Sequence, residues 1–138
     1  MEFNPNSNIV KLCLQGMDLE EKSRPEEACS IFLQAWNEGT NDFEKFLAAY
    51  YVSRHQKNVP VKLKWIETAL QFASNINDDN IKSAFPALYS NIANCFEELG
   101  DLDKAKENHE LATSFKGQLY DNGPFYHGTK VDLKVAIC

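Results

Sequence analysis

Hydrophobic residues recur every three or four positions over most of this chain, which is the spacing of amphipathic helices. The pattern predicts six helices, at about residues 8–22, 25–36, 42–56, 60–76, 81–99 and 102–116. Proline, glycine and short polar runs separate them, with Gly39 and Gly100 suited to left-handed helix ends. The chain is therefore expected to be all-α up to about residue 117.

One spacing of small and aromatic residues occurs twice. Two sets of five residues carry it, 77 positions apart: Gly16, Leu19, Ala28, Phe32 and Ala35, and then Ala93, Phe96, Ala105, His109 and Ala112. Small residues at these places let two antiparallel helices approach closely, and His109 is expected to fill the inward ring position of Phe32. A repeated helical hairpin predicts a stacked repeat protein, and such proteins mostly hold other molecules.

The last hairpin resembles the tetratricopeptide repeat (TPR). The positions that fit that motif are Tyr89, Ile92, Ala93, Phe96, Leu99, Gly100, Leu102, Ala105 and Ala112. The first hairpin fits less fully, and the middle one, about 42–76, is degenerate. The resemblance covers about residues 8–117 and implies three hairpins in a short right-handed superhelix. We expect a repeat domain over residues 1–120 and an extended tail over 121–138.

In TPR proteins the first helix of each hairpin lines the concave face. Projected onto this chain, that face is expected to present Cys13, Met17, Glu20, Phe43, Phe46, Tyr50, Arg54, Ser90, Asn94 and Glu97. A trough lined by rings with acidic edges suits a peptide or partner protein with apolar anchors and basic flanks. The alternative is that some of these rings pack against a neighbouring helix. The predicted function is a non-catalytic protein-interaction module and scaffold.

The tail carries a second resemblance. Residues 123–135, GPFYHGTKVDLKV, resemble the start of the rifampin ADP-ribosyltransferase (Arr) family. The resemblance implies that His127, Gly128 and Thr129 are a remnant of an NAD-binding site. The rest of that fold is absent, so the alternative reading is an inactive fragment of such a transferase, or a partner to one. Val131 to Ile137 alternate as a strand would.

Charge and cysteine content narrow the functional classes. The chain has 138 residues and a net charge of −6, which argues against binding to nucleic acid or to an anionic membrane surface. No signal peptide or membrane span is evident. Four scattered cysteines, without a CxxC pair, indicate reduced thiols in the cytoplasm and no metal site. No cofactor is expected. An exposed end of the repeat stack could form a homodimer.

The histidines and acidic pairs are the candidate catalytic residues of the chain. His55 is expected to cap carbonyls near a helix end or to bond the next turn, and neither His55 nor His109 has a nucleophile at a spacing typical of a triad. Paired glutamates such as Glu20-Glu21 are expected on solvated faces. The run 77–80, Asn-Asp-Asp-Asn, predicts a turn with an N-cap and lacks the glycine and distal glutamate of a calcium loop. The sequence thus predicts no catalytic residue.

Overall fold

The computed structural model describes the backbone of residues 6–121 and the side chains of residues 6–115. Seven helices account for most of this part: α1 (Asn8–Glu21), α2 (Pro25–Glu38), α3 (Asp42–Ser53), α4 (Val59–Ser74), α5 (Asp79–Lys82), α6 (Phe85–Glu98) and α7 (Leu102–Asp121). The described residues contain no strand, so the predicted all-α class is confirmed for them. The strand-like segment expected at 131–137 lies outside the described residues.

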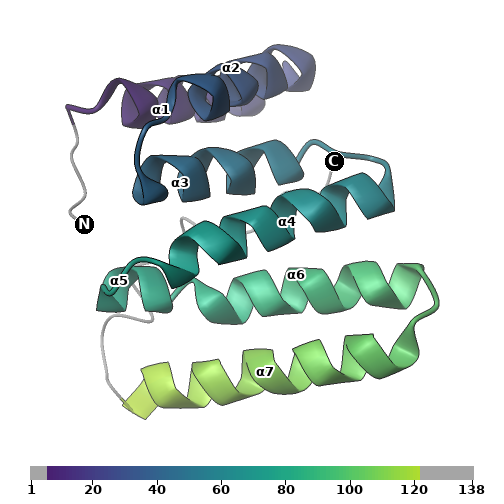
Figure 1. The fold of residues 1–138 in the computed structure, drawn as a ribbon. Coiled ribbons are helices and arrows are strands. Elements are labelled where there is room, and N and C mark those ends of the chain that lie inside the picture. The colour runs from purple at the N-terminus through teal and green to yellow at the C-terminus, as the bar shows by residue number, and fades with distance from the viewer. Residues whose placement is uncertain (1–5, 122–138) are drawn as a thin grey trace.

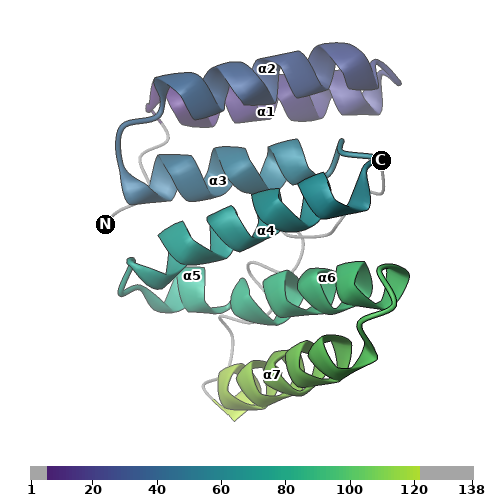
Figure 2. The same cartoon turned by 45° about the vertical axis from the view of Figure 1, so that its right-hand side comes forward.

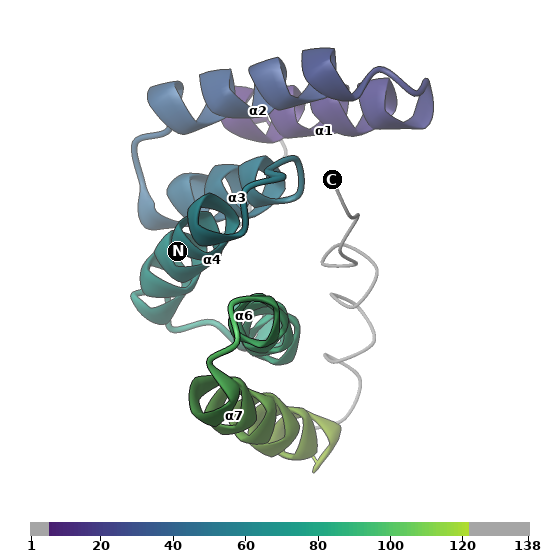
Figure 3. The same ribbon diagram turned by 90° about the vertical axis from the view of Figure 1, so that its right-hand side faces the viewer.

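The six longer helices pack in three antiparallel pairs (Figure 1), α1 with α2, α3 with α4, and α6 with α7. Between pairs, α3 packs on α2 and α1, and α6 packs on α4. The short helix α5 links α4 to α6 (Figure 2). Seen along α4 and α6, the pairs follow one another along an arc (Figure 3), with α4 on its outer side.

Helix α3 lies at the centre of the core because it is covered by helices on several sides. Its residues Ala48 to Ser53 are all buried, including the whole side chain of Tyr50. A helix that is apolar all round is stable only when neighbours cover it. Phe43 and Phe46 join the same core with Ile9, Cys13, Ile66 and Leu88 from other helices. The aromatic richness of this segment is therefore used largely for packing.

The 77-residue repeat is visible in the helix bounds. Helix α6 has the bounds of α1, and α7 the start of α2, each displaced by 77 positions. The turns also match: Ser23 and Gly100 are both left-handed, with φ of 60° and 82°. In each turn a backbone N–H reaches back to close the helix, from Arg24 to the Leu19 carbonyl and from Asp101 to the Phe96 carbonyl, both at 2.9 Å. The first and last hairpins are therefore built alike.

The predicted close approach at Gly16 is confirmed. A Cβ atom placed on Gly16 would lie 2.3 Å from Cε1 of Phe32, well inside contact distance. Phe32 is 0% exposed, so its ring lies directly on the glycine backbone. Proline at the start of α2 confirms the predicted first helical turn, and Asp78 caps α5 by accepting from the Asn80 N–H.

Several local expectations were wrong. Gly39 is extended, with φ −63° and ψ 142°, because the chain leaves α2 directly towards the Asn41 cap of α3. The single helix expected at 81–99 is divided into α5 and α6. The sequence allowed Pro86 to mark either the true first turn or a kink, and the structure places it in the first turn of α6. Leu102 and His109 face outwards, since no further hairpin covers α7 within the described residues. The position of His109 is buried where another hairpin follows, as Phe32 shows, whereas Pro25, the equivalent of Leu102, is exposed in the first hairpin as well.

Candidate functional site: a polar cluster between α1 and α3

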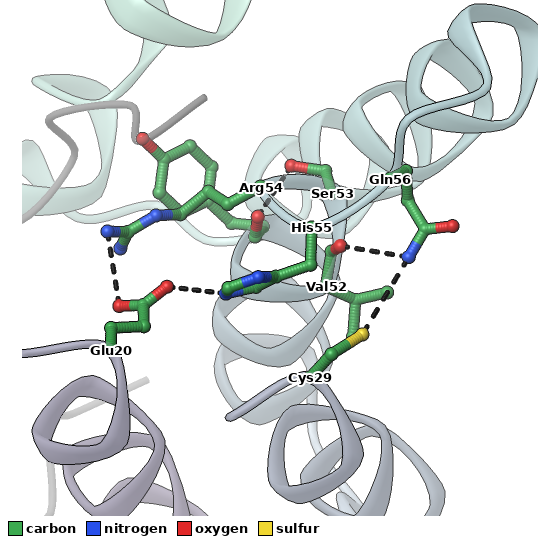
Figure 4. Close-up of polar contacts among 8 residues, drawn as sticks. Glu20, Cys29, Val52, Ser53, Arg54, His55 and Gln56 are labelled. Carbon is green, nitrogen blue, oxygen red and sulfur yellow. Dashed lines mark hydrogen bonds and ion pairs between the residues drawn. The ribbon is translucent and has the colours of Figure 1, made fainter. Parts of the chain in front are cut away.

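Glu20 joins the end of α1 to the end of α3. One of its carboxylate oxygens lies 3.2 Å from Nη2 of Arg54, and the other lies 2.5 Å from Nε2 of His55 (Figure 4). The three side chains are only 15%, 12% and 11% exposed. Partial burial strengthens such contacts relative to those of solvated ion pairs. The predictions that Glu20 is solvated and that His55 caps carbonyls were therefore wrong.

Helix geometry explains why the two basic residues are found here. Helix α3 ends at Ser53, and Arg54 is its C-cap residue, so both basic side chains follow a helix end where carbonyl groups carry partial negative charge. The hydroxyl of Ser53 donates to the Tyr50 carbonyl at 2.5 Å and satisfies one of these carbonyls. The Gln56 side chain donates to the Val52 carbonyl at 3.2 Å and contacts the Cys29 sulfur at 3.9 Å. The end of α3 is thus fixed against both α1 and α2.

Aromatic rings form the apolar side of the cluster. The guanidinium of Arg54 lies 5.0 Å from the ring centroid of Tyr51. Phe32 of α2 stacks on Tyr51, with centroids 5.0 Å apart, and lies 5.6 Å from the imidazole of His55. Burial raises the pKa of Tyr50, beside these groups, well above its ordinary value, although the charge of Arg54 opposes this. The Tyr50 phenol therefore stays neutral at physiological pH.

One donor of the cluster is left without an acceptor. Nε of Arg54 is buried and makes no hydrogen bond in the structure. A buried donor without a partner costs free energy, so such groups are usually explained by a ligand, a water molecule or a functional role. Because this nitrogen has almost no accessible surface, a further oxygen atom could reach it only if a neighbouring side chain moved.

The other residues predicted for the concave face divide into buried and accessible groups. Cys13, Phe43, Phe46 and Tyr50 are buried and belong to the hydrophobic core. Met17, Glu20, Arg54 and Ser90 are partly exposed, and Asn94 and Glu97 are exposed. The structure brings Glu20 and Arg54 together, and it places Glu97 against His109 on α7 at 3.2 Å. The binding role predicted for this set stays a prediction, but its accessible members are mostly polar.

The described thiols are buried or half-buried. Burial raises the pKa of Cys13 to about 12 and also raises the pKa of Cys29 and Cys95. A thiol with a raised pKa carries little thiolate at neutral pH and is a weak nucleophile. In the described part of the chain no three His, Cys, Asp or Glu side chains come together as metal ligands would. His127, Gly128 and Thr129, predicted as an NAD-binding remnant, lie outside the described residues.

Sequence reasoning missed the contact between Glu20 and His55. The two residues are 35 positions apart, and no local spacing links the end of one hairpin to the end of the next hairpin's first helix. The repeat itself held a clue, because Glu97 occupies the position of Glu20 in the last hairpin.

Comparison with protein-family models, curated proteins and solved structures found no match. Among the described helices, none combines the length and apolar character needed to cross a membrane.

Proposed function

We propose that this chain is a non-catalytic interaction module that binds a peptide or a partner protein along the inner side of its arc. The binding surface would be the accessible residues of α1 and α6 together with Arg54 at the end of α3. The TPR-like spacing of the sequence and the paired helices of the structure support this proposal. The raised pKa values of the three described thiols are consistent with a role that needs no nucleophile.

The observation that carries the proposal is the unpartnered Nε of Arg54. Arg54 is held by Glu20 and by the ring of Tyr51, so its Nε–H donor has a fixed position before any ligand arrives. A bound chain that displaced a neighbouring side chain could place a main-chain carbonyl on this buried donor. Because the donor is already desolvated, the hydrogen bond would form with little further loss of solvation.

The remaining accessible residues fit the partner chemistry expected from the sequence. Half-buried Met17 offers an apolar contact, and exposed Glu97 offers a carboxylate at the far end of the surface. The net charge of −6 favours a ligand with basic flanks and would speed its association at low salt. We therefore propose a partner segment with an apolar anchor between basic residues.

Site-specific photo-crosslinking in host extract tests the proposal. A photoreactive amino acid replaces Asn94, which is exposed on α6, and in the matched control it replaces Gln71, which is exposed on α4 of the outer side. We expect one or a few partners to be captured from position 94 only, with capture reduced by added salt. Equal capture from both positions, or none from position 94, would refute inner-side binding.

The transferase reading is tested separately. It rests on residues 123–135, so calorimetric titration of the chain with NAD addresses it directly. Heat of binding that disappears in His127→Ala would favour it. A silent titration would leave the interaction module as the better account.

A further inference from the structure

The last hairpin carries an open hollow on the face that the first hairpin uses to bind its neighbour. The hollow measures about 470 Å³ and is shallow. It is lined by the end of α6 and one side of α7, at Glu97, Leu102, Ala105, Lys106, His109, Glu110 and Thr113. Each of these residues has an equivalent in the first hairpin, 77 positions earlier in the chain. The equivalents are Glu20, Pro25, Ala28, Cys29, Phe32, Leu33 and Trp36.

In the first hairpin, most of this face is covered by the second hairpin, whereas Pro25 and Leu33 at its edges are exposed. Glu20 binds Arg54 and His55, and Cys29 contacts Gln56. Phe32 stacks on Tyr51. Further along the face, Trp36 meets the Trp65 ring edge-on, with centroids 5.2 Å apart. The helix α3 thus shows which kind of segment fits this surface and how it lies there.

We propose that the hollow on the last hairpin is a second docking site, which takes an amphipathic helix of a partner protein. The helix would present an aromatic ring to His109 and a basic residue at its C-terminal end to Glu97, as α3 presents Tyr51 to Phe32 and Arg54 to Glu20. This site goes beyond the inner-side binding proposed above. Apart from Glu97, which borders both surfaces, the residues of the hollow belong to α7 and not to the helices of the inner side.

The differences between the two faces suit a reversible contact. His109 replaces Phe32 and Thr113 replaces Trp36, so the open face is stable in water without a covering helix. The Glu97–His109 pair is 51% and 45% exposed, so a cation on an incoming helix can reach the carboxylate of Glu97. Leu102, which is 68% exposed, provides an apolar contact at the rim. Glu110 adds a second carboxylate to the lining, which outweighs the single ammonium group of Lys106 and favours a basic partner.

The helix α3 itself provides the probe. A fluorescein-labelled peptide with the sequence of residues 41–58, NDFEKFLAAYYVSRHQKN, is titrated with the full chain and followed by fluorescence anisotropy. We expect saturable binding that Glu97→Gln weakens about tenfold, or about 1.4 kcal/mol. Leu102→Asp should weaken it at least as much. The control Glu98→Gln changes an exposed neighbour outside the hollow and should leave binding unchanged.

Other outcomes would overturn the proposal. Absence of binding, or binding that Glu97→Gln does not change, would show that the hollow does not recognise such a helix. Weakening by Glu20→Gln alone would mean that the peptide exchanges with α3 on the first hairpin. A concentration-dependent dimer abolished by Leu102→Asp would assign the face to a second copy of the chain. Each result is independent of crosslinking at position 94, so failure here leaves the proposed function open.

Discussion

At the scale of single residues, the two matching turns show how different side chains can serve one backbone conformation. Ser23 and Gly100 both adopt positive φ and close a helix in the same way. A side chain with a Cβ pays a steric penalty in this conformation, which glycine avoids. The first hairpin therefore stores backbone strain that the last hairpin does not.

Replacing Ser23 by glycine should relieve that strain. We expect Ser23→Gly to raise the free energy of unfolding by about 0.5–1 kcal/mol, since the gain outweighs the extra entropy of glycine in the unfolded chain. The matched control is Gly100→Ser, which should lower it by about 1 kcal/mol. No atom lies within 4 Å of a Cβ on Gly100, so that loss would come from the backbone alone. Urea unfolding followed by circular dichroism measures both. A lower free energy of unfolding in Ser23→Gly, or a higher one in Gly100→Ser, would contradict the assigned turn conformation.

At the scale of helices, Glu44 connects the start of α1 to the start of α3. Its carboxylate accepts from the hydroxyl of Ser7 at 2.8 Å and from the backbone N–H of Thr40 at 3.0 Å. Ser7 is also the N-cap residue of α1. Burial raises the pKa of Glu44, but these hydrogen bonds together with those from the Thr40 hydroxyl and Asn41 outweigh it, so the net pKa is lowered.

A lowered pKa has a defined consequence for stability. The folded state binds the Glu44 proton more weakly than the unfolded state, so the contribution is complete above the ordinary glutamate pKa of 4.5 and is lost as the pH falls through the folded value. We expect Glu44→Gln to lower the free energy of unfolding by about 1 kcal/mol at pH 7 and by less at pH 3. Urea titrations at both pH values measure this. The control Glu107→Gln, on the exposed side of α7, should change the free energy of unfolding little at either pH. A loss of stability in Glu44→Gln that is larger at pH 3 than at pH 7 would contradict the predicted role of the Glu44 carboxylate.

Helices were the part of this structure that the sequence predicted well. Periodic apolar positions located the six longer helices, and the spacing of Gly16 and Phe32 predicted their close contact. Contacts between hairpins were not predictable in the same way, because Glu20 and His55 meet only after α3 packs on α1. Gly39 misled for a related reason: glycine permits a left-handed end but does not require one. Local pattern therefore determined elements, and packing determined the site.

At the scale of the whole molecule, position in the stack decides what an equivalent residue does. Phe32 and His109 occupy the same place in hairpins of matching geometry, yet the phenyl ring is 0% exposed and the imidazole 45%. The second hairpin covers the first one, whereas none of the described helices covers α7 on its outer side. Most of the neighbours of His109 on α7 are exposed and polar, which is how a repeat stack ends in water.

Exchanging the two rings tests this order of hairpins. Phe32→His puts a polar ring into a core site between Tyr51 and Gly16, and we expect it to lower the free energy of unfolding by about 3 kcal/mol. His109→Phe changes a half-exposed site and should alter stability by no more than about 0.5 kcal/mol. Equilibrium urea unfolding of both variants provides the comparison. The two hairpins share helix bounds and turn geometry, although Ala93 stands where the first hairpin has Gly16, so we attribute a large difference mainly to what covers the two rings. Similar losses in both variants would mean that the outer face of α7 is also covered in solution, and the last hairpin would no longer be the free end of the stack.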